Sequence, residues 1–343
     1  MLNYPIRESP LYEKLSNEKL RCGVCERRCV IGLGKKSFCK TKMNIEGKLY
    51  TLVYGDISAL ESRPIEIKPF FHFYPGSTAL TFSTWSCNFR CPWCQNWHLS
   101  RTEPNPEKAN YVSPERMVET ALKNRDEGLC ASFQEPTLLF EYSLDVFKIA
   151  REKLYNCWVS NGYFTLDALR MLAGAGMNAI KIDVKGDEEV YKKYCRGIDA
   201  EKIWRNAREA KKLGMHVEIV NLVITDINDD EACLSEIIER HIKEAGGNVP
   251  LHFTRYYPAY KFTNPQTKIE TLERAYEIAK KAGVLYPYIG NVPGHRYENT
   301  YCPECGELLI RRFGFSVAEY KIKDKNCPNC GEEIPIAGRH VKK

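Results

Sequence analysis

The sequence contains no apolar run long enough to cross a membrane. Its longest apolar-rich stretch, residues 216–224, is interrupted by Glu218 and Asn221, whereas a spanning helix needs about 20 predominantly apolar residues. The first fifteen residues carry charges throughout and lack the apolar centre of a secretory signal peptide. These absences argue against a membrane protein and predict a cytoplasmic chain with no membrane partner.

The sequence also has little excess charge of either sign. Fifty basic and 44 acidic residues leave a net charge of +6, which is below the level that indicates a nucleic-acid-binding surface. The basic residues form no stripe with interleaved aromatic side chains, the pattern that binding of single-stranded nucleic acid requires. We therefore expect no nucleic-acid partner.

Cysteine, by contrast, is abundant. Fifteen cysteines in a chain without a secretion signal indicate metal or redox chemistry rather than disulfide bonds. Four are scattered, and we interpret them as small buried side chains: Cys130, Cys157, Cys195 and Cys233. The other eleven form three groups: Cys22, Cys25, Cys29 and Cys39; Cys87, Cys91 and Cys94; Cys302, Cys305, Cys327 and Cys330.

Between the second and third cysteine groups, short β-rich runs alternate with amphipathic helical stretches. Nearly continuous apolar runs predict strands that are buried on both faces: residues 80–86, 129–133, 156–160, 179–184, 216–224 and 251–256. Helices are predicted over residues 113–127, 138–153, 165–175, 199–213 and 230–245, with a last helix that ends at 281. The predicted fold class is α/β, a partial or closed parallel (β/α)6 barrel.

Local signals place helix ends and domain boundaries. Ser113 followed by Pro114 predicts a helix N-terminus, and Thr267 with Glu270 has the spacing of a capping box. Four glycines are expected as left-handed caps after helices: Gly128, Gly176, Gly214 and Gly283. We expect an N-terminal extension over residues 1–74, a barrel over 75–293 and a C-terminal domain over 294–343.

Residues that suggest chemistry follow the predicted strands. Cys87 follows the first strand, Glu135 the second and Asn161 the third, while Asp183 and Lys185 end the fourth. Because parallel β/α folds carry their active sites at the carboxyl ends of strands, we expect these residues to form one site. The structural alternatives are an ion pair between Asp183 and Lys185, and a capping role for Glu135.

The middle cysteine group offers three thiolates within eight residues. Four cysteines saturate every iron of a [4Fe-4S] cluster, so three leave one iron open. An open iron can chelate an amine and a carboxylate, such as the methionyl end of S-adenosylmethionine (SAM). The alternative is a zinc site in which His98 joins Cys87, Cys91 and Cys94.

This loop carries a family resemblance. The spacing C-x-x-x-C-x-aromatic-C after the first strand resembles the radical SAM superfamily, and CNFRCPWCQN is similar to the loop of the enzymes that activate glycyl-radical enzymes such as pyruvate formate-lyase. Segments along nearly the whole chain together resemble the AmmeMemoRadiSam-system radical SAM proteins: PIEIKPFFHFYPGS, SFQEPT, SNGY, IDVKG, LVITDIND, HFTRYYPAYK, YIGNVPG and the paired CPxCG knuckles. The resemblance implies a radical-SAM-type barrel with a [4Fe-4S] cluster and SAM.

Carried over by position, the resemblance assigns roles to individual residues. It implies that Cys87, Cys91 and Cys94 hold the cluster and that Trp93 lies beside the adenine of SAM. Further SAM contacts are implied after the later strands: Gln134, Glu135, Ser160, Asn161, Asp183 and Lys185.

The sequence departs from the family pattern at two places. Phe133 and Gln134 stand where the superfamily has two glycines before the glutamate. Tyr257 stands where the activating enzymes have a histidine after the sixth strand. The second departure predicts that this chain handles its substrate differently.

The two flanking cysteine groups predict two more metal sites. Cys302, Cys305, Cys327 and Cys330 form paired knuckles, the zinc-ribbon pattern, with rubredoxin-like iron as the alternative. The uneven spacing of Cys22, Cys25, Cys29 and Cys39 fits no single metal well, and it favours zinc and an auxiliary [4Fe-4S] cluster about equally.

The predicted function is that of an oxygen-sensitive, anaerobic oxidoreductase. It cleaves SAM to a 5'-deoxyadenosyl radical, which takes hydrogen from a protein, a peptide or a small molecule. A low-potential donor such as flavodoxin or ferredoxin is the expected partner. Two alternatives remain: a non-enzymatic zinc and iron–sulfur protein that binds RNA or a partner protein, and an electron carrier in which His98 is the fourth ligand.

Overall fold

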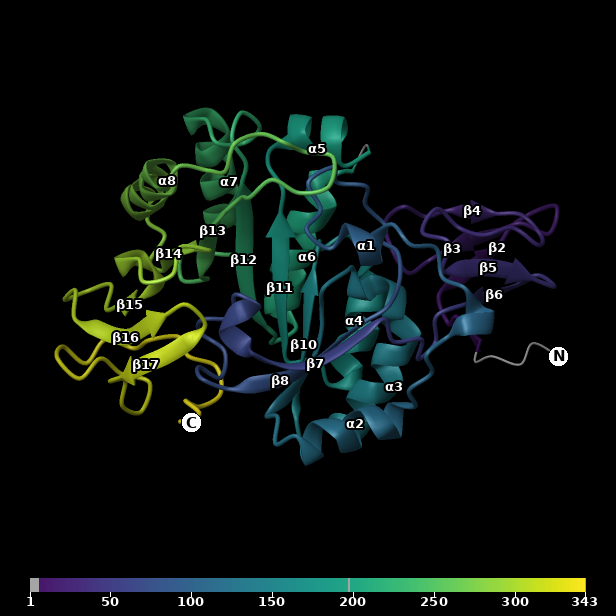
Figure 1. Ribbon diagram of the computed structural model, residues 1–343, viewed down its shortest axis with the longest axis horizontal. Helices are drawn as coiled ribbons and strands as arrows, with labels where there is room; N and C mark the ends of the chain where they lie inside the picture. The colour runs from purple at the N-terminus through teal and green to yellow at the C-terminus, as the bar shows by residue number, and fades with distance from the viewer. Residues whose placement is uncertain (1–5, 197, 343) are drawn as a thin grey trace. The chain divides into compact units, whose positions relative to one another are not determined.

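The computed structural model describes residues 6–196 and 198–342 (Figure 1). Within these residues the chain divides into two compact units. The first comprises Met1–Arg63, Ala79–Ile180 and Lys212–Met215, as far as they are described. The second comprises the described residues of Pro64–Thr78, Lys181–Lys211 and His216–Lys343.

Two small antiparallel sheets open the first unit, in purple in Figure 1. One has the order β1-β6-β5, formed by Arg7–Glu8, Lys48–Thr51 and Lys42–Ile45. The other has the order β2-β3-β4, formed by Tyr12–Lys14, Leu20–Cys22 and Val30–Ile31. Strands of two to four residues bury little apolar area. Leu20, Ile31 and Leu49 are nevertheless buried, so each of the two sheets contributes apolar side chains to the core of the unit.

The first unit also contains the first β/α units. Its strands are β7 (Ala59–Pro64), β8 (Thr78–Ser83), β9 (Gly128–Ala131) and β10 (Tyr155–Ser160). Its helices are α1 (Trp97–Ser100), α2 (Pro114–Lys123), α3 (Phe140–Ala150) and α4 (Leu166–Ala175). Strand β9 pairs in parallel with both β8 and β10. All four residues of β9 are buried, as expected for a strand covered on both faces.

The second unit continues the alternation. Strand β11 (Ala179–Val184) begins in the first unit and ends in the second, and is followed by β12 (His216–Val223), β13 (Leu251–Arg255) and β14 (Pro287–Gly290). The helices are α5 (Glu188–Tyr194), α6 (Ala200–Lys212), α7 (Glu231–Glu244) and α8 (Ile269–Ala282). Strand β13 pairs in parallel with both β12 and β14.

The hydrogen-bonded order of the eight strands is β14-β13-β12-β11-β10-β9-β8-β7. The order is linear within the described residues, so the barrel is partial and not closed. The six predicted strands correspond to β8–β13, and the α/β fold class is confirmed. The sequence did not predict β7 or β14. No helix in the described parts of the chain combines the length and apolar character that a membrane crossing needs.

Helix-end predictions were confirmed at some positions and wrong at others. Ser113 caps α2 by accepting a hydrogen bond from the Arg116 N–H, as predicted. Thr267 does not form the predicted capping box. Its buried hydroxyl donates to the Val223 carbonyl and accepts from the Tyr256 N–H, while α8 starts after Lys268 without a side-chain cap. Thr267 therefore makes tertiary hydrogen bonds instead of the helix cap that the local spacing predicted.

Gly128 corrects a second helix-end prediction. Gly176 and Gly283 are left-handed C-caps with φ of 104° and 103°, and Gly214 also has a positive φ. Gly128 instead begins β9, where a Cβ atom would lie 1.9 Å from the ring of Tyr155. This glycine is needed because a neighbouring strand approaches closely, and not as a left-handed cap.

The C-terminal segment forms a small antiparallel sheet within the second unit. Its order is β15-β16-β17, formed by Thr300–Tyr301, Leu308–Phe313 and Ser316–Tyr320. Cys302 and Cys327 belong to a buried cluster that also contains Tyr286 and Tyr288 from the region of β14. The cysteine ribbon therefore shares a core with the last strand of the large sheet. The domain boundaries expected near residues 74 and 293 stay predictions.

Candidate functional site

The three-cysteine loop follows β8 in the first unit and is held by arginines. Arg101 donates to the Phe89 carbonyl at 2.9 Å and to the Cys91 carbonyl at 2.8 Å. Arg90 donates to the Cys87 carbonyl at 2.6 Å. Charged donors make strong hydrogen bonds, so these two side chains fix the path of a loop that lies outside helix and strand.

The loop sulfurs have local donors. The Phe89 N–H donates to Cys87 Sγ at 3.3 Å, and Cys94 Sγ lies 3.2 Å from the Ser100 hydroxyl. Burial and the nearby carboxylate of Glu135 raise the pKa of the Cys87 thiol. Asn161 bonds both to Glu135 and to Asn88 of the loop, so the loop and Glu135 lie close together, as their positions after β8 and β9 predicted.

Two asparagines join the loop to the ends of the next strands. Asn161 Nδ2, just after β10, donates to Asn88 Oδ1 at 2.8 Å. Asn96 donates to the carbonyl of Phe133, just after β9. The structure thus brings together the loop and the segments after β9 and β10.

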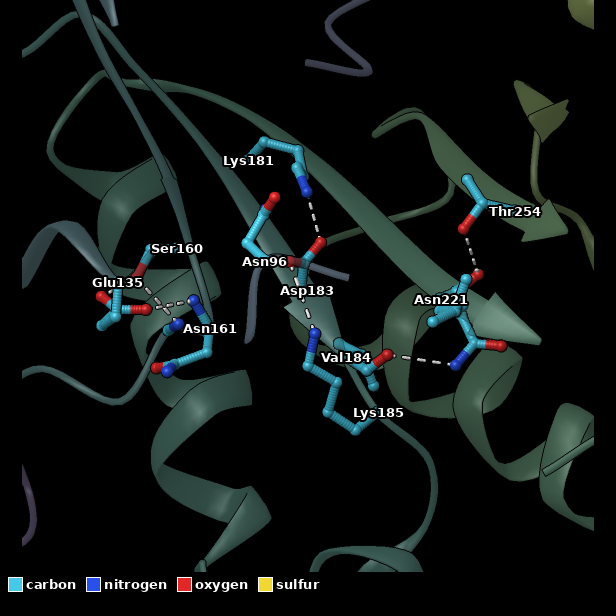
Figure 2. A network of polar contacts seen from close by, with 12 residues as sticks. Asn96, Glu135, Ser160, Asn161, Lys181, Asp183, Val184, Lys185, Asn221 and Thr254 are labelled. Atoms are coloured by element: carbon cyan, nitrogen blue, oxygen red, sulfur yellow. Dashed lines mark hydrogen bonds and ion pairs between the residues drawn. The ribbon is translucent and has the colours of Figure 1, made fainter. Parts of the chain in front are cut away.

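Glu135 is the centre of this arrangement (Figure 2). The Ser160 hydroxyl and the Asn161 N–H each donate to its carboxylate at 2.8 Å, from the end of β10. Thr137 donates from its N–H at 3.1 Å and from its hydroxyl, so Glu135 also caps the 3-10 helix Pro136–Leu139. Burial raises its pKa despite these donors. The capping alternative therefore describes its geometry, and its contact with SAM stays a prediction.

Gln134 differs from its neighbour. Its side chain is 8% exposed, yet neither the oxygen nor the nitrogen of its amide has a hydrogen-bond partner within the described residues. The Nδ2 of buried Asn88 is also unmatched. Buried polar groups without partners are costly, and they commonly mark a site where a polar ligand binds. These unmatched groups beside the cysteine loop fit the methionyl end of SAM.

Strand β11 carries a charged cluster at its end, in the second unit (Figure 2). Asp183 forms an ion pair with Lys181 and a second with Lys185, the latter at 3.4 Å. Although burial acts to raise it, the pKa of Asp183 is lowered because the two ammonium groups favour the carboxylate. The ion-pair alternative is thus present, and roles for Asp183 and Lys185 in binding SAM stay predictions.

The C-terminal cysteines have the geometry of a single-ion site. Their four sulfurs all lie within 4.8 Å of one another, with Cys302 and Cys330 3.5 Å apart and Cys305 and Cys327 3.7 Å apart. Zinc–sulfur bonds of about 2.3 Å in a tetrahedron place the sulfurs about 3.8 Å apart. The residues therefore fit a closed four-thiolate site.

The loop cysteines are arranged more widely. Among the described cysteines, the C-terminal set alone has its sulfurs gathered within 4.8 Å of one another. His98, the proposed fourth zinc ligand, is exposed. Wider spacing is expected for a [4Fe-4S] cluster, because each cysteine binds a different iron. The assignment of the loop cysteines to a cluster, and not to zinc, stays a prediction.

Sequence reasoning missed several residues that shape these sites. Lys181, Asp183 and Lys185 are two residues apart along β11 and the residue that follows it, and this spacing predicts that they lie on the same side of the strand. Asn88 and Asn96 carried no such signal, because their partners are distant in the sequence. Trp93 is 3% exposed, and its place beside an adenine stays a prediction.

Comparison with known proteins agrees with this arrangement. The family model of the Radical SAM superfamily matches residues 83–239, which include the cysteine loop and β9–β12. The uncharacterized protein MJ0808 of Methanocaldococcus jannaschii is 42% identical over 335 residues, which cover 96% of this chain and 99% of that protein.

One solved structure shows the same fold, and a second is similar over part of the chain. A radical SAM methyltransferase from Sphaerobacter thermophilus superposes with a TM-score of 0.50 at 15% identity, over 63% of this chain and 67% of that one. A domain of a pyruvate-formate lyase-activating enzyme from Bacteroides vulgatus gives a TM-score of 0.41 at 20% identity, over 48% of this chain and 99% of the domain. With three cysteines on the loop after the first barrel strand, the chain belongs to the radical SAM superfamily, whose cofactors are a [4Fe-4S] cluster and SAM.

Proposed function

We propose that this chain cleaves SAM reductively at a [4Fe-4S] cluster held by Cys87, Cys91 and Cys94, and that the product abstracts hydrogen from a substrate. The observation that carries the proposal is the connection between the cysteine loop and the strand ends through Asn88 and Asn161. When bound, the cluster supplies the electron that splits SAM into methionine and a 5'-deoxyadenosyl radical.

The residues of the chain have separable roles in this proposal. The three cysteines hold three irons, and the fourth stays open because the exposed His98 is not gathered with them. Gln134 offers an unmatched amide to the amino and carboxylate groups of SAM. Glu135 positions Ser160 and the Asn161 N–H through its hydrogen bonds.

The remaining assignments rest on the family resemblance. We place Trp93 beside the adenine, and Asp183 with Lys185 among the polar contacts of SAM. The C-terminal four-cysteine site holds one tetrahedral ion, because its sulfurs are closely gathered; we assign zinc, with rubredoxin-like iron as the alternative. The reaction takes place in an oxygen-poor cytoplasm, with an electron donor such as flavodoxin or ferredoxin.

We further propose a protein or peptide substrate, by similarity to the glycyl-radical activating enzymes. Tyr257, which stands in place of their histidine, is exposed after β13, and its hydroxyl donates to the Asn291 carbonyl at 3.1 Å. An exposed aromatic side chain with a polar tip suits contact with a peptide. A small-molecule substrate is the alternative that labelling experiments distinguish.

The test is an anaerobic turnover assay. Protein reconstituted with iron and sulfide receives SAM and dithionite, and 5'-deoxyadenosine is measured by mass spectrometry, with deuterium-labelled candidate proteins present. Wild type is expected to form 5'-deoxyadenosine, and label in it identifies the substrate. Cys91→Ala is expected to abolish the product.

A matched control is Cys130→Ala, which removes a buried cysteine from β9 outside the three cysteine groups. This variant should keep wild-type turnover. Product formation by Cys91→Ala at the wild-type rate would refute the site assignment. No product from wild type, together with destruction of the cluster in His98→Ala, would favour an electron carrier with four ligands.

A further inference from the structure

The four N-terminal cysteines converge from separate turns of the first unit. Cys22 ends β3, and Cys39 lies in the turn before β5. Burial, followed by the neighbouring thiols of Cys22 and Cys39, raises the pKa of Cys25, and Cys29 adds to this effect. The four sulfurs therefore share one neighbourhood although the sequence separates them by up to 17 positions.

Each of these sulfurs has a hydrogen-bond donor. The backbone N–H groups of Val24, Arg27 and Phe38 donate to the sulfurs of Cys22, Cys25 and Cys29, respectively. The hydroxyls of Ser37 and Thr41 each lie 3.1 Å from Cys39 Sγ. Donors aimed at sulfur stabilise thiolates, and in iron–sulfur proteins they help to set the potential. Because burial raises the pKa of Cys22, Cys25 and Cys29, these donors would offset part of the cost of holding thiolates here.

The spacing of the sulfurs distinguishes two kinds of metal group. The C-terminal sulfurs all lie within 4.8 Å of one another, as one tetrahedral ion requires. Among the described residues, no three of the N-terminal sulfurs are gathered within such a distance of one another. A four-iron cluster needs wider spacing, because each cysteine binds a different iron. Among the described residues, neither the N-terminal sulfurs nor the loop sulfurs are gathered as closely as the C-terminal four.

Cationic side chains surround the N-terminal set. Arg27 acts to lower the pKa of Cys29, and Lys42 acts to lower that of Cys22. Lys42 is itself buried against Glu141, and both side chains are 3% exposed. Glu141 acts to raise the pKa of Cys22, so its ion pair compensates the charge of Lys42. Arg27, by contrast, can offset the charge of bound thiolates.

The N-terminal site is joined to the catalytic loop within the same unit. The guanidinium carbon of Arg27 lies 3.9 Å from the centre of the Phe38 ring, and that of Arg90 lies 4.7 Å from it. Arg27 also donates to the carbonyl of Asn88, and Arg90 to that of Cys87. Arg90 interacts electrostatically with Cys87 and with Cys39.

The same segment docks on the turn after β10. Cys25 forms an isolated bridge with Phe164, and the Glu26 N–H donates to the Tyr163 carbonyl at 3.1 Å. The Thr165 hydroxyl donates to the Gly23 carbonyl at 2.7 Å. Asn161, which bonds to Asn88, lies at the start of this turn.

We propose that Cys22, Cys25, Cys29 and Cys39 hold a second [4Fe-4S] cluster, docked beside the loop cysteines by Arg27, Phe38 and Arg90. The cluster has four protein ligands, so it is saturated and does not bind SAM. This site does not depend on whether SAM is cleaved.

The test counts acid-labile sulfide, because inorganic sulfide is present in clusters and absent from single-ion sites. Anaerobically reconstituted and desalted wild type is expected to contain about eight sulfides per chain, four for each cluster. The triple variant Cys87→Ser/Cys91→Ser/Cys94→Ser should retain about four, with the Mössbauer signature of a four-iron cluster. Cys25→Ser/Cys29→Ser should also retain about four, and Cys130→Ala about eight.

The count in wild type keeps the test decisive if a variant fails to fold. About four sulfides in wild type, with zinc or a lone iron at the N-terminal site, would overturn the proposal. Turnover of SAM with four sulfides would refute this inference and leave the proposed function standing. Eight sulfides without turnover of SAM would support this inference and refute the proposed function.

Discussion

Asn161 Nδ2 donates a 2.8 Å hydrogen bond to Asn88 Oδ1 across 73 positions of sequence. Asn88 follows the first loop cysteine, and Asn161 follows β10. Since both side chains are buried, the bond is shielded from competing water. This pair fixes the cysteine loop relative to the strand ends where SAM is proposed to bind.

Asn161→Ala should therefore loosen the loop. It removes the amide that donates to the side-chain oxygen of Asn88 and the oxygen that accepts from the Tyr163 N–H, which costs about 1–3 kcal/mol. The loss is measured by denaturant unfolding, and faster loss of iron to a chelator should accompany it. Asn124→Ala, which removes an exposed asparagine, should change stability by less than about 0.5 kcal/mol. Equal effects of the two variants would contradict the assigned role.

Substitutions of Gln134 and of Glu135 are predicted to affect the stability of the SAM-free protein differently. Glu135 accepts from four donors, so Glu135→Ala should destabilise the SAM-free protein by about 3 kcal/mol. Gln134→Leu removes an unmatched buried amide at similar volume, so it should leave the SAM-free protein as stable or more stable.

The affinity for SAM provides a second test of the role of Gln134. If the Gln134 amide bonds to SAM, Gln134→Leu should weaken binding about tenfold, by the loss of about 1.4 kcal/mol. Equilibrium dialysis with labelled SAM measures this constant without turnover. A destabilised Gln134→Leu protein with unchanged SAM affinity would show that Gln134 is structural.

The central strands were the most predictable part of the fold, because the apolar pattern of a strand depends directly on its burial. Residues 179–184 were predicted as a strand and form β11 with the same bounds. Strand β14 was missed because Pro287–Gly290 has only four residues, and β7 because its middle residues are exposed.

Polar contacts were less predictable than strands. The cysteine groups were visible because metal ligation constrains spacing along the chain. The partners of Asn88 and Thr267 are set by tertiary structure, which the local sequence does not encode by a spacing rule. The capping box at Thr267 was wrong for this reason.

A pH dependence is expected from His241, which is buried on α7 and bonds through Nε2 to the Val249 carbonyl at 3.0 Å. Burial lowers its pKa to about 4, below the value of about 6.5 in an unfolded chain. Its contribution to stability is complete above about pH 6.5 and is lost as the pH falls toward 4. The slope in this window is about 1.4 kcal/mol per pH unit.

His241→Gln retains a donor and removes the titration. Unfolding free energies measured between pH 4 and 7.5 should depend less on pH, by about one proton, than those of the wild type. The other buried histidines, His72 and His252, keep part of the acid sensitivity in both proteins. Identical slopes would contradict the lowered pKa of His241.

The C-terminal metal is predicted to stabilise the second unit and not only its own ribbon. Cys302 and Cys327 pack in one buried cluster with Tyr288 and Ile310. Removal of one zinc per chain by a chelator, followed with a colorimetric zinc indicator, should lower the melting temperature and expose the C-terminal segment to proteolysis. Release of zinc with no change in melting temperature would contradict this coupling.

The central claim is that three cysteines leave one iron of the loop cluster open to SAM. Mössbauer spectra of the anaerobic, iron-labelled protein, recorded before and after SAM is added, test it most directly. The account predicts that SAM changes the signal of one iron per loop cluster, and that this change disappears in Cys91→Ala. An iron spectrum that SAM leaves unaltered, in protein with an intact loop cluster, would contradict the account.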